Sequence, residues 1–188
     1  MKADGNGQLW TIGHSVRPWQ EFVDMLLAAR IEVLADVRRF AGSRRNPQFG
    51  GQAMAATLSG SGIDYVPLPE LGGRRTARAD SPNVAWRNAG FRGYADYMQT
   101  ADYQHAHARL AGLAKQGRVA VMCAEAMWWQ CHRSLIADDF KARGWQVVHL
   151  LAPGREQEHP YTGAARLVEG RLDYTAAGQS GSQPSLFP

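Results

Sequence analysis

The stretch RVAVMCAEAMWWQCHRSLIADDFKARGWQVVHLL, residues 118–151, has the pattern of one strand–helix–strand unit. Residues 118–124 form a short apolar run rich in valine, which is typical of a buried strand. Residues 131–143 carry a helical pattern that ends at Gly144, and residues 145–151 predict a second buried strand. Because parallel strands need a crossover connection of about this length, the stretch indicates an α/β fold with a parallel sheet.

The chain before this unit repeats the alternation of short strands and helices. We expect strands at residues 9–13, 33–37 and 63–68, helices at about 18–30, 52–58 and 94–116, an interruption near Thr100, and a hairpin over 165–174 turning at Glu169–Gly170. The sequence therefore predicts a three-layer α/β fold. Its sheet is mainly parallel and five-stranded, with helices on both faces and a small C-terminal hairpin.

The composition suits one globular domain. The chain has 188 residues, of which 45% are hydrophobic, so it can bury a core without disulfides. Two cysteines do not make a secreted framework, no apolar run reaches the roughly 20 residues that cross a bilayer, and no signal peptide is evident. We expect a cytoplasmic protein with free thiols and no membrane association. Residues 1–8 are expected to be a flexible N-terminus, 9–175 a single domain and 176–188 a flexible tail.

The basic residues are concentrated in the middle of the chain. The net charge is only +4, but the window from Arg38 to Arg92 contains nine arginines and three acidic residues, a local charge of +6. Codon bias in a GC-rich genome explains the excess of arginine over lysine equally well. The clustering, by contrast, indicates a surface suited to an anionic partner, with DNA as one possibility.

Polar residues follow every predicted strand at the point where the strand ends. They are Gly13-His14-Ser15, Arg38-Arg39 with Asp36 just inside, Glu70 to Arg75, Cys123-Ala124-Glu125 and Pro153-Gly154-Arg155. In an open parallel sheet, ligands bind outside the carboxyl ends of the strands. Five separate segments thus bring candidate polar groups to one edge, which favours an active site there.

Three residues at this edge are candidates for catalysis. Cys123 ends a strand that faces the helix beginning near Cys131, where free N–H groups and the helix dipole favour a thiolate. This makes Cys123 a candidate nucleophile, with His14 as its base. Glu125 precedes two tryptophans and is a candidate acid or base. The alternatives are a buried core cysteine and a glutamate that pairs with an arginine.

Other residues at the edge are candidates for binding. The candidate anion- or phosphate-binding residues are Arg38, Arg44, Arg45, Arg74, Arg75 and Arg133. Trp128 and Trp129 are suited to stacking on a base or sugar, or to packing in the core. A zinc site at Cys123, Cys131 and His132 has none of the usual ligand spacings, so we predict no metal, and no cofactor is indicated.

Several blocks of the sequence resemble the DUF488 family of bacterial and archaeal proteins. They are TIGHS (11–15), LADVR (34–38), SRRNPQF (43–49), YVPLPELGGRR (65–75), FRGYADYM (91–98) and the run 123–151. The resemblance covers about residues 9–151 and implies an α/β domain, but no settled reaction. A looser similarity to rhodanese-like and phosphatase domains rests on a DVR after an early strand and a cysteine loop ending in Arg-Ser. Cys123 and Arg133 lie ten positions apart, too far for that anion cradle, so its chemistry is not carried over.

The C-terminal peptide QPSLF, residues 183–187, resembles the short peptide by which bacterial polymerases and repair proteins bind the sliding clamp. The resemblance implies polar contacts from Gln183 and an apolar pocket filled by Leu186 and Phe187. Pro184 replaces the more usual leucine. The alternative is a tail without a partner.

Three functions are consistent with these features. The first is an enzyme of DNA maintenance or repair, a hydrolase or transferase that acts on a phosphate-bearing or nucleic-acid substrate through the Cys/Glu/Arg site. The second is a thiol-dependent enzyme for a small anionic metabolite. The third is a non-catalytic nucleic-acid-binding adaptor that the tail brings to replication sites. We take the first as the leading hypothesis.

Overall fold

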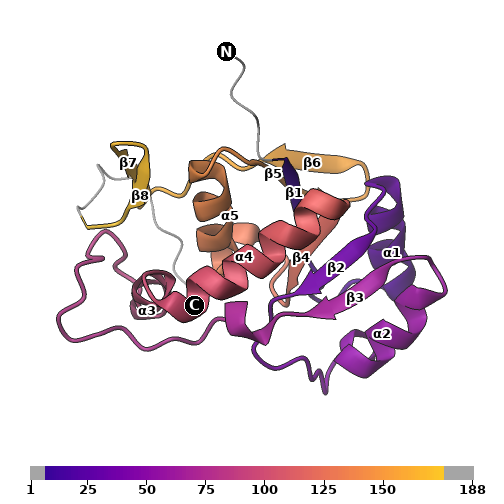
Figure 1. Ribbon diagram of the computed structural model, residues 1–188. Coiled ribbons are helices and arrows are strands. Elements are labelled where there is room, and N and C mark those ends of the chain that lie inside the picture. The colour runs from indigo at the N-terminus through magenta and orange to yellow at the C-terminus, as the bar shows by residue number, and fades with distance from the viewer. Residues whose placement is uncertain (1–6, 176–188) are drawn as a thin grey trace, which may run out of the picture.

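The computed structural model describes residues 7–175, and its centre is a six-stranded sheet with strand order β3-β2-β4-β1-β5-β6 (Figure 1). The strands are β1 (Gln8–Gly13), β2 (Val33–Asp36), β3 (Asp64–Pro67), β4 (Val119–Cys123), β5 (Gln146–Ala152) and β6 (Arg155–Glu158). The first five are parallel, as predicted. The sixth, β6, runs antiparallel to β5 and was not expected, because its sequence REQE has no alternation of apolar residues.

Helices cover both faces of the sheet, which confirms the three-layer prediction (Figure 1). They are α1 (Trp19–Ala28) and α2 (Gly51–Ser59) on one face, and α3 (Ala89–Met98), α4 (Ala101–Gln116) and α5 (Arg133–Ala142) on the other. Three short 3-10 turns, η1 (Pro47–Phe49), η2 (Pro69–Leu71) and η3 (Trp128–Gln130), lie in the loops. The interruption expected near Thr100 is present, since its side-chain oxygen accepts the N–H of Tyr103 and caps α4. None of the helices within residues 7–175 combines the length and apolar character needed to span a membrane.

The central strand β4 is buried along its whole length. Its alternate residues face opposite layers: Val119, Val121 and Cys123 pack with the α3–α5 side, whereas Ala120 and Met122 pack with the α1–α2 side. This alternation directs the Cys123 side chain towards the layer that contains α5.

The topology brings the ends of β1 and β4 together. β1 continues into α1 on one face and β4 into α5 on the other, so the chain leaves these neighbouring strands in opposite directions. Such a switch point leaves a crevice outside the strand ends. Backbone hydrogen bonds continue beyond the strands, from the N–H of His14 to Cys123 O (3.1 Å) and from the N–H of Ser15 to Ala124 O (2.8 Å). A Cβ at Gly13 would overlap the backbone of Glu125, so only glycine permits this approach.

The predicted C-terminal hairpin is present as β7 (Arg166–Val168) and β8 (Arg171–Asp173). Its two turn residues, Glu169 and Gly170, both have positive φ, 50° and 75°, as a type I′ turn requires. The hairpin stands apart from the six-stranded sheet, close to the end of α5 (Figure 1). The predicted clamp-binding residues Gln183, Leu186 and Phe187 lie outside the described residues.

A buried chain of polar groups links the hairpin side of the molecule to the sheet. Thr11 Oγ1 contacts His149 Nδ1 at 2.7 Å, His149 Nε2 contacts His159 Nδ1 at 2.9 Å, and His159 Nε2 contacts Asp138 Oδ1 at 2.8 Å. Tyr174 completes the chain by donating its hydroxyl hydrogen to Asp138 Oδ2 at 2.7 Å. Because all these groups are buried, the chain holds β1, β5 and α5 in one arrangement.

We predict that acid destabilises the fold through His149. Burial, followed by the nearby His159 and Arg133, lowers the pKa of His149 from 6.5 to about 2. The folded state therefore resists a proton that the unfolded state accepts. The contribution of neutral His149 to the free energy of unfolding is complete above about pH 6.5. It is lost as the pH falls from there towards 2, and the free energy of unfolding decreases by up to about 1.4 kcal/mol per pH unit. Urea unfolding at several pH values from 7 to 4 measures this slope, and His149→Gln should reduce it; an unchanged slope would contradict the assignment.

Candidate active site

A cavity of about 880 Å³ opens at the carboxyl ends of β1, β2 and β4. Its lining comes from His14, Arg38, Arg39, Phe40, Gly42, Ser43, Gly73, Arg74, Asn88, Ala89, Gly90, Phe91, Tyr94, Cys123, Ala124, Glu125, Gln130, Cys131 and His132. Four of the five strand-end segments thus contribute to one cavity. The fifth, Pro153-Gly154-Arg155, does not line it, because β5 turns there into the antiparallel β6.

Two sulfur atoms lie in this cavity at the junction of β4 and α5. Cys123 Sγ and Cys131 Sγ are 2.8 Å apart, and both residues are buried. Burial, together with the hydrogen bond to Cys131, raises the pKa of the Cys123 thiol well above its usual value. The backbone N–H of Arg133 donates to Cys131 Sγ at 3.4 Å. The helix-end N–H that we expected to assist Cys123 therefore points to Cys131, whereas Cys123 Sγ donates to the carbonyl oxygen of Glu125 at 3.7 Å.

Arg133 places a positive charge beside these sulfurs. Its side chain is 1% exposed, and its Nη2 donates to the carbonyl oxygens of Glu125 (3.2 Å) and Ala126 (3.1 Å). Its Nε has no hydrogen-bond partner, and within residues 7–175 no carboxylate forms an ion pair with it. A guanidinium stays charged in proteins, so a thiolate in the adjacent pair would supply the missing counter-charge. The positive charge of Arg133 lowers the pKa of Cys123 and so partly offsets the rise that burial causes.

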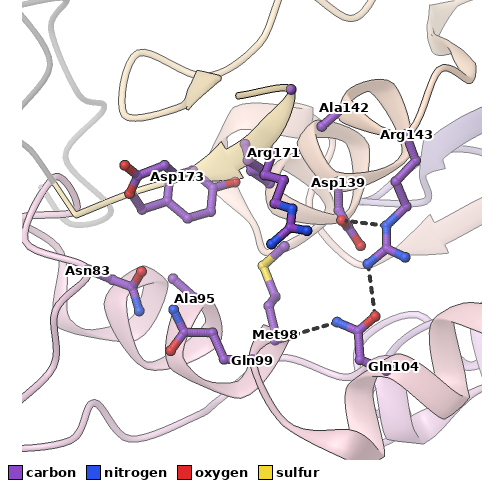
Figure 2. Close-up of a pocket in the computed structure, with 13 residues that line it drawn as sticks. Asn83, Ala95, Met98, Gln99, Gln104, Asp139, Ala142, Arg143, Arg171 and Asp173 are labelled. Carbon is purple, nitrogen blue, oxygen red and sulfur yellow. Dashed lines mark hydrogen bonds and ion pairs between the residues drawn. The ribbon is translucent and has the colours of Figure 1, made fainter. Parts of the chain in front are cut away.

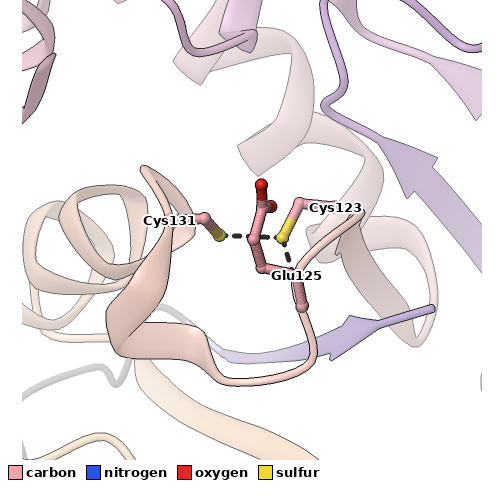
Figure 3. A group of neighbouring side chains, drawn as sticks. All are labelled: Cys123, Glu125 and Cys131. Atoms are coloured by element: carbon pink, nitrogen blue, oxygen red, sulfur yellow. Dashed lines mark hydrogen bonds between the residues drawn. The ribbon is translucent and has the colours of Figure 1, made fainter. Parts of the chain in front are cut away.

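Glu125 completes a group of three potential metal ligands with the two cysteines (Figure 3). Its exposed carboxylate and the two sulfurs all lie within 4.8 Å of one another, a donor set that zinc accepts. Two observations disfavour a divalent cation. Two thiolates on one tetrahedral zinc would be roughly 3.7 Å apart, whereas these sulfurs are 2.8 Å apart, and the charge of Arg133 would repel the ion.

His132 also lines the cavity, although the sequence indicated it only as a weak metal ligand. Its Nε2 lies 3.1 Å from the carbonyl oxygen of Val37 and therefore carries the hydrogen. Burial lowers its pKa to about 4, so the ring is neutral near pH 7 with Nδ1 as a free acceptor. A Cβ at Gly73 would lie only 2.8 Å from this Nδ1. No local pattern reveals this role, because Val37 lies 95 positions away in the sequence.

His14 and Arg38 are held in a fixed network. Arg38 Nη2 lies 2.6 Å from Asp36 Oδ2, and its Nη1 donates to Phe49 O at 2.8 Å and contacts His14 Nε2 at 3.2 Å. His14 Nδ1 lies 2.9 Å from the carbonyl oxygen of Ser15. Both nitrogens of His14 thus have partners other than Cys123, so its role as a base stays a prediction. The charge of Arg38 is already balanced by Asp36.

The remaining candidate arginines divide into two groups. Arg74 lines the cavity, and so does Arg39, which was not among the candidates and whose Nη1 donates to Arg74 O at 3.2 Å. Arg75 lies over the ring of Tyr97, 3.6 Å from its centroid, and does not line the cavity. Arg44 and Arg45 are exposed and are also absent from its lining. Anion binding in this cavity is therefore best served by Arg39 and Arg74.

The two tryptophans lie outside the cavity lining. Trp128 is buried, with its ring stacked on His149 at 4.6 Å and 6°, and its Nε1 donates to Gln157 Oε1 at 3.1 Å. This matches the core-packing alternative for Trp128. Trp129 packs edge-on against Trp128 and is partly exposed, so a stacking role on a ligand stays a prediction for this residue.

A second cavity of about 710 Å³ lies between α3, α4, α5 and β8 (Figure 2). Its charged lining residues are Asp139, Arg143, Arg171 and Asp173, of which Asp139 and Arg143 pair with each other at 2.9 Å. It shares no lining residue with the first cavity and contains neither cysteine. We therefore place the candidate active site in the larger cavity.

Comparison with known proteins gave one match. Residues 18–140, about two thirds of the chain, match the sequence model of a family described as a domain of unknown function, DUF488. No curated protein and no solved structure matched the chain.

Proposed function

Because the chain belongs to the DUF488 family, whose description names no reaction, we propose its function from the site: a thiol-dependent enzyme acting on a small anionic substrate. The observation that carries the proposal is the sulfur pair beside Arg133, a buried cation that forms no ion pair with a carboxylate in residues 7–175. A cavity of about 880 Å³ suits a small molecule.

Cys131 is the favoured nucleophile. It lies at the amino end of α5, its sulfur accepts the N–H of Arg133, and it lines the cavity. Cys123, which we first considered for this role, is the buried neighbouring thiol, and its sulfur lies 2.8 Å from Cys131 Sγ. The nucleophile thus moves to the neighbouring sulfur, while the same strand–helix junction still supplies it.

Two groups near the sulfurs are suited to proton transfer. Glu125 is exposed, and its carboxylate lies within 4.8 Å of both sulfur atoms. The neutral His132 lines the cavity, and its Nδ1 is the acceptor nitrogen because Nε2 carries the hydrogen that faces Val37 O. Arg39 and Arg74 provide positive charge for the substrate anion, and Phe40 provides an exposed apolar wall.

Alkylation of Cys131 by iodoacetamide tests this function. We expect inorganic phosphate to slow the reaction, because an anion held by Arg39 and Arg74 blocks the approach to the sulfur. The double variant Arg39→Ala/Arg74→Ala should lose this protection, with the alkylated residue identified by mass spectrometry. Arg44→Ala/Arg45→Ala is the matched control and should keep it. The proposal fails if phosphate gives no protection, or if both double variants lose it equally.

The basic window and the C-terminal peptide favour a second candidate function, in DNA maintenance. Here the substrate would be DNA or another phosphate-bearing ligand, and Gln183, Leu186 and Phe187 would bind the sliding clamp; a non-catalytic adaptor would use the same contacts. We predict that a bacterial sliding clamp retains the full chain, and that a chain ending at residue 182 is lost from it. Equal retention of the two chains would show that the C-terminal peptide does not bind the clamp. If the affinity for DNA does not fall as the salt concentration rises, the arginines do not contact phosphates.

A further inference from the structure

The two thiols of the cavity are also placed to react with each other. We propose that Cys123 and Cys131 form a reversible disulfide, and that the chain exchanges it with a small acidic disulfide of the glutathione type. The inference rests on the proposed function in one respect, the nucleophilic thiolate at Cys131. It adds a second thiol with a defined task and names the substrate class.

The geometry requires little movement to form this bond. The sulfurs are 2.8 Å apart, and a disulfide bond is about 2.05 Å long, so the atoms must approach by roughly 0.8 Å. Both residues lie in the cavity lining, which gives a small reagent access to the pair. The nine-position loop from Cys123 to Cys131 contains the short turn η3, so the bond closes a small local ring.

The exchange has two balanced steps. The Cys131 thiolate attacks one sulfur of the small disulfide, which forms a mixed disulfide and releases one small thiolate. Cys123 then loses its proton and attacks Cys131 Sγ, and the second small thiolate leaves. The protein gives up two electrons and becomes a disulfide, and the small disulfide becomes one thiol and one thiolate. The proton from Cys123 passes to a leaving thiolate, and the neutral ring of His132 lines the same cavity.

The charge of Arg133 determines which form is favoured. In the reduced protein the proposed thiolate of Cys131 would balance this buried cation, whereas a disulfide carries no charge to do so. Oxidation is therefore disfavoured, and the disulfide is readily reduced, as in other thiol pairs whose reduced form is stabilised. An acidic small disulfide is the matching reagent because Arg39 and Arg74 line the cavity.

The test equilibrates the reduced full chain with mixtures of oxidised and reduced glutathione, then quenches in acid and counts free thiols with a maleimide. The wild-type chain should lose both thiols together, without an accumulated glutathione adduct. Cys123→Ser should stop at one glutathione on Cys131, because the resolving thiol is missing. Cys131→Ser should show neither product. Arg133→Met should shift the equilibrium about tenfold towards the disulfide, because no buried cation is left without its counter-charge.

Each other result overturns the inference. A wild-type chain that stops at the mixed disulfide shows that Cys123 does not resolve it. Thiols that react only after a chelator has removed one zinc ion per chain show a metal site instead. If Cys131 forms no adduct and also resists iodoacetamide, the proposed function fails with the inference. If phosphate-sensitive alkylation of Cys131 persists while the disulfide does not form, only the redox pair fails.

Discussion

Asp138→Ala is expected to lower the free energy of unfolding by about 3–5 kcal/mol, because it removes the acceptor at the centre of a buried network. The carboxylate accepts from the backbone N–H and the hydroxyl of Thr162 (2.8 and 2.5 Å) and from the hydroxyl of Tyr174 (2.7 Å), and it contacts His159 Nε2 at 2.8 Å. Alanine leaves the buried His159 and Tyr174 and the partly buried Thr162 without this acceptor. Urea unfolding at pH 7 measures the loss.

Two controls define this effect. Asp24 accepts a single exposed hydrogen bond, from Gln20, so Asp24→Ala should change stability by less than about 0.5 kcal/mol. Asp138→Asn keeps one acceptor oxygen and should lose less than the alanine variant. If Asp138→Ala lowers the free energy of unfolding no more than Asp24→Ala does, the network does not hold the hairpin side to the sheet.

Arg133→Met is expected to slow the alkylation of Cys131 at pH 7 about tenfold or more, because it removes the buried positive charge that stabilises a thiolate beside it. Methionine is shorter than arginine, but its flexible apolar side chain fills most of the same buried space. Since Arg133 forms no ion pair with a carboxylate among residues 7–175, its removal leaves no carboxylate unpaired, and the fold should lose only the hydrogen bonds to Glu125 O and Ala126 O. Rates of iodoacetamide reaction across pH 6–9 measure the effect.

Arg133→Lys is the matched variant for this prediction. It keeps the positive charge, so it should recover part of the rate even though it loses the hydrogen bonds to Glu125 O and Ala126 O. Equal rates for wild type and Arg133→Met would show that the buried cation does not support the thiolate. A melting temperature measured for each variant separates this result from unfolding.

The basic segment from Arg38 to Arg92 shows why the net charge of a sequence segment overestimates the charge that is free to bind an anion. Within it, Arg38 is paired with Asp36, Arg75 lies over Tyr97, and Arg78 is paired with Asp80. These arginines stabilise loops and strand ends. The charge available to a ligand in the cavity comes instead from Arg39 and Arg74, which lie 35 positions apart in the sequence and meet at its lining.

The periodicity of apolar residues was sufficient to predict most of the helices and strands. The valine-rich run at β4 and the helical pattern of α5 identified a βαβ unit, and the glycine at position 170 identified the hairpin turn. β6 escaped prediction because an edge strand of charged residues has no apolar face and is formed by backbone hydrogen bonds to β5. The strand-end rule likewise located the edge at which Cys123 and Glu125 lie.

The sequence by itself determined the α/β class, the order of elements along the chain and the strand–helix junction that carries both cysteines, because these depend on local apolar periodicity and turn residues. Only the tertiary structure decided which sulfur receives the helix N–H, that Arg133 is buried without an ion pair in the described chain, and that Val37 O fixes the tautomer of His132 in the cavity lining. Those facts depend on contacts across the β1–β4 switch point and on burial. Periodicity carries no information about either, since desolvation and hydrogen-bond geometry arise only when distant segments pack together.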